Sequence, residues 1–207
     1  MNPRSKSKSP LKERIREAVH GEILSAAERV FGASGLGAAK MEEIATAAGV
    51  SVGTLYNHFA DREALLTALL DTRRAELLDM LDDVVEQMKS EPFPAQLGRF
   101  IGTTVEHLGQ HRPLFAMLIE EELHSGRGRL RGKPALRELT ARCQRLVEQG
   151  LKQGALRKQD AAVYPALLMG FIRGVFAQAM HEDTLRLSPE LVQAMVRTFL
   201  EGAGARA

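Results

Sequence analysis

Residues 41 to 59 constrain the fold of this chain more than any other stretch. They read Met-Glu-Glu-Ile-Ala-Thr-Ala-Ala-Gly-Val-Ser-Val-Gly-Thr-Leu-Tyr-Asn-His-Phe. Two short helical patterns meet at a turn containing Gly49, where glycine adopts a positive φ without steric cost. Ser51 is placed to cap the second pattern, because its hydroxyl can accept a hydrogen bond from a backbone N–H of the first turn. This spacing predicts a helix-turn-helix of the kind that enters the DNA major groove.

Hydrogen-bonding side chains gather on the second helix of this predicted unit. Ser51 and Thr54 offer hydroxyls to phosphate oxygens, and Tyr56 carries a hydroxyl on a longer, rigid side chain. The spacing turns Leu55 and Phe59 toward a core. The alternative is a helix-turn-helix used only for packing, but its second helix is too polar on one face for a good core helix.

The charge distribution agrees with local DNA contact. The formal net charge of the 207 residues is only +2, yet residues 1–16 hold six bases against one acid. Residues 63–86 hold seven acids against two bases. A basic N-terminal segment followed by an acidic segment is consistent with DNA contact through the N-terminal part of the chain.

The remaining composition indicates a soluble cytoplasmic protein without a membrane segment. Hydrophobic residues make up 44% of the chain, enough for a packed core. The single cysteine, Cys143, excludes an internal disulfide and suits a reducing compartment. No apolar run approaches the roughly 20 residues of a membrane span, and no apolar segment follows the basic N-terminus as in a secretory signal.

Apolar residues recur at helical spacing, and no useful alternating strand pattern occurs, so we expect an all-α fold of about nine helices. The expected helices are approximately 11–32, 41–48, 52–59, 62–88, 95–110, 113–124, 135–153, 161–181 and 189 onward, with Asp61, Asp160 and Ser188 as caps. The expected domains are a disordered basic arm (1–10), a three-helix DNA-binding domain (11–60) and a ligand-binding and dimerisation domain (61–207). The arm either reaches along phosphates or only keeps the chain in solution.

The stretch from Ile44 to Phe59 resembles the DNA-binding domain of the TetR family of bacterial transcriptional regulators. Residues 61–66 (Asp-Arg-Glu-Ala-Leu-Leu) and 27–31 (Ala-Glu-Arg-Val-Phe) extend the resemblance, which covers about residues 15–66, roughly a third of the chain. The remainder resembles the family only in the number and length of its helices. Two positions depart from the family pattern: Lys40 replaces a Ser or Thr cap, and Val52 replaces a frequent Lys or Arg.

The resemblance implies where DNA contacts lie. Residues near Val52, Tyr56 and Asn57 approach base edges in the family, and Arg62 matches a common phosphate contact. Val52 favours apolar contact with a thymine methyl, and Lys40 is expected to touch phosphate. The expected DNA-contacting residues are Lys40, Ser51, Val52, Gly53, Thr54, Tyr56, Asn57, His58 and Arg62.

The resemblance also implies an effector pocket in the second domain. A mostly apolar pocket with a few polar groups suits a lipophilic or amphipathic small molecule. The alternative is that the same residues only form the core. The expected pocket residues are Phe100, Thr104, His107, Phe115, Leu118, Glu121, Cys143, Leu146, Met169, Ile172, Arg173 and Phe176.

Metal ligation is weighed at His107 and His111, which stand four residues apart, with Glu120, Glu121, Glu122 and His124 soon after. His111 precedes Arg112-Pro113, so it is expected at a helix end, where a histidine can simply interact with the helix dipole. We therefore expect neither a metal nor a cofactor. Cys143 is expected to be a small buried hydrophobe rather than a redox sensor.

A dimer face is expected on the last two helices. Gly170 and Gly174 lie four apart on an apolar helix and permit close helix approach, and the family pairs its last two helices as a four-helix bundle. The alternative is packing within one chain. The expected interface residues are Leu167, Gly170, Phe171, Gly174, Gln178, Leu191, Met195, Val196 and Phe199.

The resulting hypothesis is a homodimeric, ligand-responsive regulator, a repressor released from a pseudo-palindromic operator by a small effector. An alternative is a helical-bundle carrier or enzyme without a DNA-binding role. Against the alternative, the sequence lacks a Gly-x-Ser-x-Gly motif, a phosphate loop and a zinc-ligand set. A DNA-binding protein without an effector is a third possibility.

Overall fold

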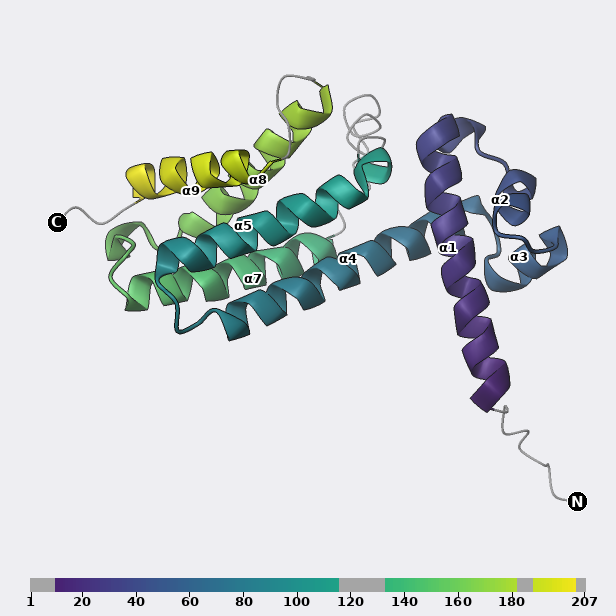
Figure 1. Ribbon diagram of the computed structural model, residues 1–207, viewed down its shortest axis with the longest axis horizontal. Coiled ribbons are helices and arrows are strands. Elements are labelled where there is room, and N and C mark those ends of the chain that lie inside the picture. The colour runs from purple at the N-terminus through teal and green to yellow at the C-terminus, as the bar shows by residue number, and fades with distance from the viewer. Residues whose placement is uncertain (1–9, 116–132, 182–187, 204–207) are drawn as a thin grey trace, which may run out of the picture. The chain divides into compact units, whose positions relative to one another are not determined.

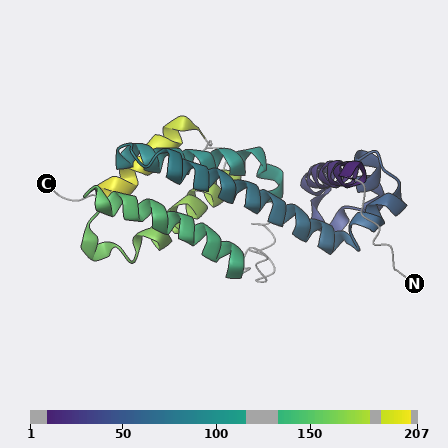
Figure 2. The same ribbon diagram turned by 90° about the horizontal axis from the view of Figure 1, so that it is seen from below.

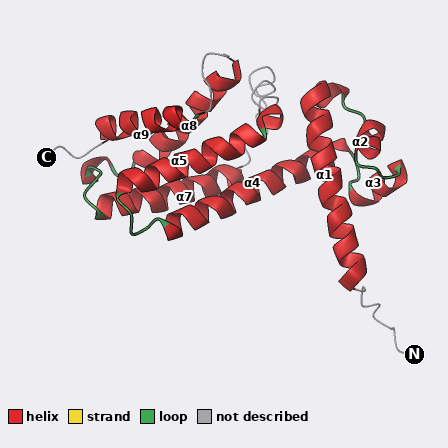
Figure 3. Cartoon of the chain, in the orientation of Figure 1, coloured by secondary structure: helices red, strands yellow, loops and turns green. Residues whose placement is uncertain are grey.

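The computed structural model describes residues 10–115, 133–181 and 188–203, and these residues form helices joined by short turns, with no strand among them (Figure 3). The all-α prediction is therefore confirmed. Residues 1–9 of the expected basic arm, most of the expected sixth helix and the pocket candidates Leu118 and Glu121 lie outside the described residues, whereas Pro10 is the first residue of a helix. Contacts divide the chain into two compact units, residues 1–72 (unit 1) and 73–207 (unit 2), each described by itself below.

Unit 1 consists of α1 (Pro10–Ala38), α2 (Met41–Ala47), α3 (Val52–His58) and the first turns of α4 (Arg62–Gln87) (Figure 1). Its core is made by apolar side chains that recur at helical spacing on each helix. The largest contributions come from Ile23, Phe31, Ile44, Leu55, Leu65 and Leu69, all fully buried.

Helix α1 ends later than predicted, and the side chains of its first turns are exposed where burial was predicted. It continues past Gly32 and is interrupted only at Gly35, whose φ of 76° and ψ of 163° are not helical. Ile15, expected to face the core, is 55% exposed. Every residue from 10 to 18 is exposed, so these first turns extend beyond the part of α1 that packs in the core, and helical spacing there creates no buried face.

Helix α4 begins as expected, because the Asp61 carboxylate accepts a hydrogen bond from the Ala64 N–H at 2.7 Å. The predicted domain boundary lies before this helix, at residues 60 and 61. In the structure the contact boundary lies at residues 72 and 73. Leu65, Leu66 and Leu69 are buried and belong to unit 1, so the first turns of α4 help complete the core of that unit.

Unit 2 contains the rest of α4, α5 (Phe93–Gln110), α7 (Lys133–Lys152), a 3₁₀ turn η2 (Lys158–Asp160), α8 (Tyr164–His181) and α9 (Pro189–Ala203). Helix α5 packs along α9, and α7 packs along α8, as the two views in Figures 1 and 2 show. A Cβ added at Gly98 or Gly102 of α5 would lie 3.7 or 3.9 Å from Val196 or Val192 of α9. These are ordinary van der Waals distances, so packing against α9 does not require glycine at either position. None of the described helices combines the length and the apolar character that a bilayer span needs.

Helix α7 is attached to α4 by polar contacts. Arg142 donates to the Asp82 carboxylate through Nε at 3.1 Å and Nη2 at 2.6 Å, and Arg145 bonds the same carboxylate. Gln149 donates to the Val85 carbonyl at 3.1 Å. The bidentate geometry of Arg142 holds the register of the two helices.

Of the two caps predicted for α8 and α9, the structure has the cap of α9 and lacks the cap of α8. Ser188 caps α9 as expected, accepting a hydrogen bond from the Leu191 N–H at 3.4 Å, with Pro189 at the first helical position. The expectation that Asp160 caps α8 is wrong. Its carboxylate pairs with Arg157 Nε at 3.1 Å within the η2 turn, and α8 starts four residues later, at Tyr164.

Candidate nucleic-acid interface

The turn between α2 and α3 has the geometry that its sequence predicts. Gly49 has a φ of 68°, in the region that favours glycine. The Val50 N–H donates to the Ala45 carbonyl at 3.0 Å, and the Thr54 N–H donates to Ser51 Oγ at 3.0 Å. The turn and the Ser51 cap are therefore confirmed.

Helix α3 has one buried side and one exposed side. Leu55 is fully buried and Phe59 nearly so, whereas Val52 and Tyr56 are 37% and 48% exposed. Asn57 is exposed beside them. The exposed side of α3 therefore presents one apolar and one aromatic side chain beside a polar amide.

Neither steric crowding nor backbone conformation within the chain requires glycine at position 53. An added Cβ would meet only Ser51 Oγ, at an ordinary distance of 3.8 Å, and Gly53 is not among the residues with positive φ. Glycine inside a helix costs about 0.5–1 kcal/mol relative to alanine. Packing within the chain therefore does not require glycine at this position.

The hydroxyls of Ser51 and Thr54 form a pair 2.8 Å apart. Ser51 Oγ also accepts from the backbone, so one of the two hydroxyls donates to the other and one hydroxyl hydrogen is left for an outside acceptor. The pair at the start of α3 therefore suits a phosphate oxygen, as expected for both residues.

Two of the expected basic contacts have different surroundings. Lys40 is exposed at the N-cap position of α2 and makes no capping hydrogen bond, consistent with its expected failure as a cap. Arg62 Nη1 donates to the carbonyls of Gly37 and Ala39, at 3.0 and 3.4 Å. Arg62 therefore holds the connection between α1 and α2 in place, a structural role that the sequence did not suggest.

His58 lies at the end of α3, with its ring centroid 5.8 Å from that of His20 on α1. Burial, then the nearby His20 and Arg16, lower the pKa of His58 below its usual 6.5. The imidazole is therefore neutral at pH 7, when it still has one N–H to donate.

Most of the expected pocket residues form the packed core of unit 2. Phe100, Cys143, Leu146, Ile172 and Phe176 are buried, and Thr104 is buried with its hydroxyl bonded to the Phe100 carbonyl at 2.9 Å. Burial raises the pKa of Cys143 to about 12, so its thiol is unreactive at neutral pH. Phe115 and Met169 are half-buried, whereas Arg173 is exposed and does not belong to an interior pocket.

A cavity of about 280 Å³ lies elsewhere in unit 2, between α4 and α5. Of the expected pocket residues, it includes only His107. Its lining is more polar than expected and consists of Met80, Asp83, Val84, Gln87, Met88, Arg99, Thr103, Glu106, His107 and Gln110.

The expected dimer residues divide between surface and core. Leu167 is 54% exposed, and Gly170, Gly174 and Gln178 are exposed near it on α8. Met195 and Phe199 are instead buried in the core of the same chain, and their assignment to an intermolecular face is corrected. The half-buried members are Phe171, Leu191 and Val196.

An all-helical chain that exposes a capped second helix after a glycine turn belongs to the helix-turn-helix class of DNA-binding folds. Residues 23–69 match the family model described as "Bacterial regulatory proteins, tetR family". Residues 23–69 of the chain are therefore similar to regulators of the TetR family. The curated relatives that the chain matches are transcriptional regulators, which are not enzymes.

Similar proteins agree with this assignment. An uncharacterised HTH-type transcriptional regulator of Mycobacterium tuberculosis is 45% identical over 80 residues, 37% of this chain and 40% of that protein. The HTH-type transcriptional regulator UidR of Escherichia coli is 27% identical over 79% of this chain and 83% of its own length. The FadR regulator of Bacillus subtilis, crystallised with stearoyl-CoA, superposes with a TM-score of 0.73 at 19% identity, covering 88% of this chain and 98% of FadR. The chain spans only 35–40% of the length of several curated relatives that it matches.

Proposed function

We propose that the chain is a DNA-binding transcriptional regulator that acts in the cytoplasm as a homodimeric repressor and is released from its operator by a small molecule. The observation that carries the DNA-binding part is the exposed face of α3. There Val52, Tyr56 and Asn57 stand in solvent around Gly53, at which no neighbour in the chain forbids a side chain. A helical carrier without a DNA-binding role, the alternative considered above, gives no reason for this face.

A second copy of the chain is needed because one short helix reads few bases. Two copies related by a twofold axis have to present their α3 helices one DNA turn apart, about 34–36 Å, on a pseudo-palindromic site. The phosphate contacts expected at Lys40 and Ser51 fix the register, while Tyr56 and Asn57 are directed at base edges.

The exposed face of α8 supports the same conclusion. A Cβ added at Gly170 or Gly174 has no neighbour within 4 Å, so packing within the chain does not require glycine at either position. Leu167, a half-exposed large hydrophobic, lies on the same helix, and the half-exposed Val163 lies in the turn just before it. Two glycines flanked by apolar side chains suit close packing against α8 of a second copy, which we take as the core of the dimer interface.

Release by an effector requires that the effector bind the DNA-free form more tightly than the DNA-bound form. Helix α4 contributes residues to both units, so a change in unit 2 that moves α4 also acts on unit 1. FadR of Bacillus subtilis, with the same fold, holds stearoyl-CoA. We propose a lipophilic or amphipathic effector for this chain, by analogy of fold.

The test is DNA binding by the full chain. DNA fragments are first selected from a random pool, and Tyr56→Ala is compared with Met80→Ala, which truncates an exposed side chain of unit 2. We expect Tyr56→Ala to lose at least about tenfold in affinity for the selected site, the value of a good base contact, and Met80→Ala to bind like the unaltered chain. Lys40→Ala is expected to weaken all sequences alike and to reduce the salt dependence by about one ion.

Failure to enrich any fragment at low salt would refute the proposal. Equal losses for Tyr56→Ala and Met80→Ala would also refute the role of α3, provided that both variants fold as judged by circular dichroism.

A further inference from the structure

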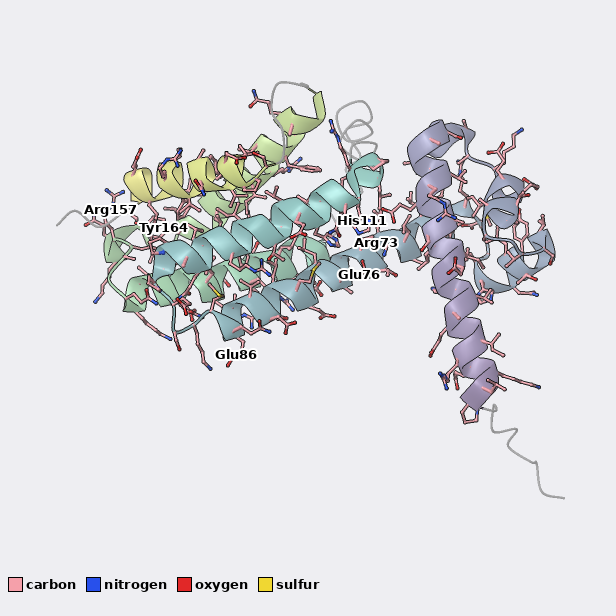
Figure 4. The ribbon with its side chains drawn as sticks, in the orientation of Figure 1. Arg73, Glu76, Glu86, His111, Arg157 and Tyr164 are labelled. Carbon is pink, nitrogen blue, oxygen red and sulfur yellow. The ribbon has the colours of Figure 1, made fainter. Side chains whose placement is uncertain are left out.

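Three potential metal ligands of unit 2, one on α4 and two at the end of α5, lie close together. Glu76 lies on α4, His107 lies in the last turn of α5, and His111 is the C-cap of α5. One carboxylate oxygen and one nitrogen of each imidazole lie within 4.8 Å of one another. Figure 4 labels Glu76 and His111, which gather with Arg73 where the end of α5 lies beside α4. Sequence spacing did not suggest Glu76, because it precedes His107 by 31 residues.

His107 is the best-defined of the three. Its side chain is only 2% exposed, and among the described residues its Nε2 is buried without a hydrogen-bond partner. The Arg73 backbone forms a hydrogen bond with the same imidazole, which leaves Nδ1 as the nitrogen involved. A buried nitrogen without a partner costs free energy. Histidines that bind metals commonly fix their ring by donating the other N–H to a backbone carbonyl.

We propose that Glu76, His107 and His111 form a binding site for a divalent transition-metal ion of the zinc class. Two imidazole nitrogens and one carboxylate oxygen suit Zn²⁺, Co²⁺ or Ni²⁺, whereas Mg²⁺ and Ca²⁺ prefer sites made wholly of oxygen. Two histidines and one glutamate are also a known three-ligand set for zinc, which leaves the fourth position for water or another molecule.

The side chains need only a small rearrangement to close around an ion. Tetrahedral bonds of about 2.0–2.1 Å bring ligand atoms to about 3.3 Å from one another. The Glu76 side chain is 43% exposed and His111 is half-buried, so both have room to turn toward the fixed ring of His107. That ring already lies close to His111, with centroids 4.7 Å apart.

Arg73 competes for the carboxylate and does not block it. Its Nη1 lies 2.8 and 3.0 Å from the two carboxylate oxygens of Glu76. A carboxylate has about four lone-pair sites, so one oxygen can remain bonded to Arg73 while another lone pair binds the ion. Ligating carboxylates are commonly held by such a second hydrogen bond.

His107 also lines the cavity of about 280 Å³ between α4 and α5. Glu76 and His111 do not line this cavity, so His107 is the one proposed ligand that it shares with the site. The proposed site lies entirely in unit 2 and does not depend on the proposed DNA-binding function, so a metal-binding experiment tests it independently.

The experiment uses the full chain after treatment with a chelator. Zn²⁺ is titrated by calorimetry, and Co²⁺ by its visible absorption, with Mg²⁺ as the comparison ion. Glu76→Gln and His111→Ala remove ligands that are not fully buried, so neither is expected to unfold the chain. Glu86→Gln is the matched control, because Glu86 is another exposed glutamate of α4 in an i, i+3 pair, with Lys89. His20→Gln controls for binding by a histidine of unit 1.

We expect one Zn²⁺ or Co²⁺ per chain and no binding of Mg²⁺. Loss of a direct ligand should weaken binding at least as much as loss of an outer-shell partner, about 10- to 100-fold, in both Glu76→Gln and His111→Ala. Glu86→Gln and His20→Gln should bind like the unaltered chain. The proposal is overturned if the unaltered chain binds neither ion at micromolar concentrations, or if Glu76→Gln binds as tightly as Glu86→Gln.

Discussion

Replacing both glycines on the exposed face of α8 should stabilise the isolated chain and weaken its association. Gly170 and Gly174 lie inside a helix, and an added Cβ meets no atom within 4 Å at either position. Alanine is favoured over glycine in helices by about 0.5–1 kcal/mol, so Gly170→Ala/Gly174→Ala should raise the free energy of unfolding of the monomer by about 1–2 kcal/mol. In the proposed dimer the same two methyl groups separate the paired helices.

The cost to the dimer follows from contact distances. A gap of about 0.5–1 Å already forfeits a quarter to a half of the dispersion energy between facing atoms. We therefore expect the dimer dissociation constant to rise by about 10- to 100-fold, or about 1.4–2.8 kcal/mol. The matched control is Gly102→Ala on α5, where the added methyl group meets Val192 of the same chain at an ordinary 3.9 Å. It should gain helix stability without weakening association.

Two measurements separate these effects. Sedimentation equilibrium over a dilution series gives the dissociation constant, and urea unfolding below that concentration gives the stability of the monomer. The reasoning about α8 is refuted if the double variant associates as tightly as Gly102→Ala while its monomer is stabilised as expected. That result would mean that the face of α8 is not in the interface.

Other predictions concern packing, capping and charge. Gly150→Ala should destabilise unit 2 by about 1–3 kcal/mol, the usual cost of overpacking, because the new Cβ would lie 2.8 Å from the Phe93 ring; urea unfolding measures the loss, and an unchanged midpoint would contradict it. Ser51→Ala should cost about 1 kcal/mol through loss of the α3 cap, and Ser51→Gly much less, in the same assay. Lowering the pH from 7.5 to 6 should strengthen DNA binding, because DNA phosphates favour the protonated form of His58. The pKa of His58 is lowered in the free protein, so DNA binding is expected to raise this pKa. One histidine per chain can change the affinity by at most about tenfold per pH unit. The same lowered pKa means that the unfolded chain takes up this proton more readily, so the fold loses stability as the pH falls below 6.5. His58→Gln should flatten both pH dependences, measured by fluorescence anisotropy and by urea unfolding, and a variant with unchanged pH profiles would contradict the assignment.

The sequence was most informative where one short segment determines its own geometry. The positive φ of Gly49 and the Ser51 cap depend on neighbours within a few residues, and both were predicted. The Asp160 cap failed because another local partner, Arg157, takes its carboxylate. Turn residues predict that the chain changes direction there, but they do not always identify the residue at which the next helix begins.

The candidate metal site depends on contacts that no local pattern contains. The i, i+4 spacing places His107 and His111 on one side of α5, but the third ligand belongs to α4. Likewise, helical spacing could not distinguish Met195 and Phe199, which face the core, from Leu167, which faces solvent. Both distinctions follow from how helices pack against one another, and the sequence of a single helix does not specify that packing.

The glycines of this chain stand at their positions for different structural reasons, which the sequence alone does not distinguish. Gly150 is required within the chain, because an added Cβ would lie only 2.8 Å from Phe93. Gly49 is required by its positive φ. Gly53 and Gly174 have neither reason, since an added Cβ would meet no crowded neighbour at either position. Gly21 on α1 and Gly202 on α9 are open in the same way, so open space around a glycine does not by itself identify a partner. At Gly53 and Gly174 the proposed DNA and dimer contacts supply a reason for glycine, despite its cost in a helix, that packing within the chain does not.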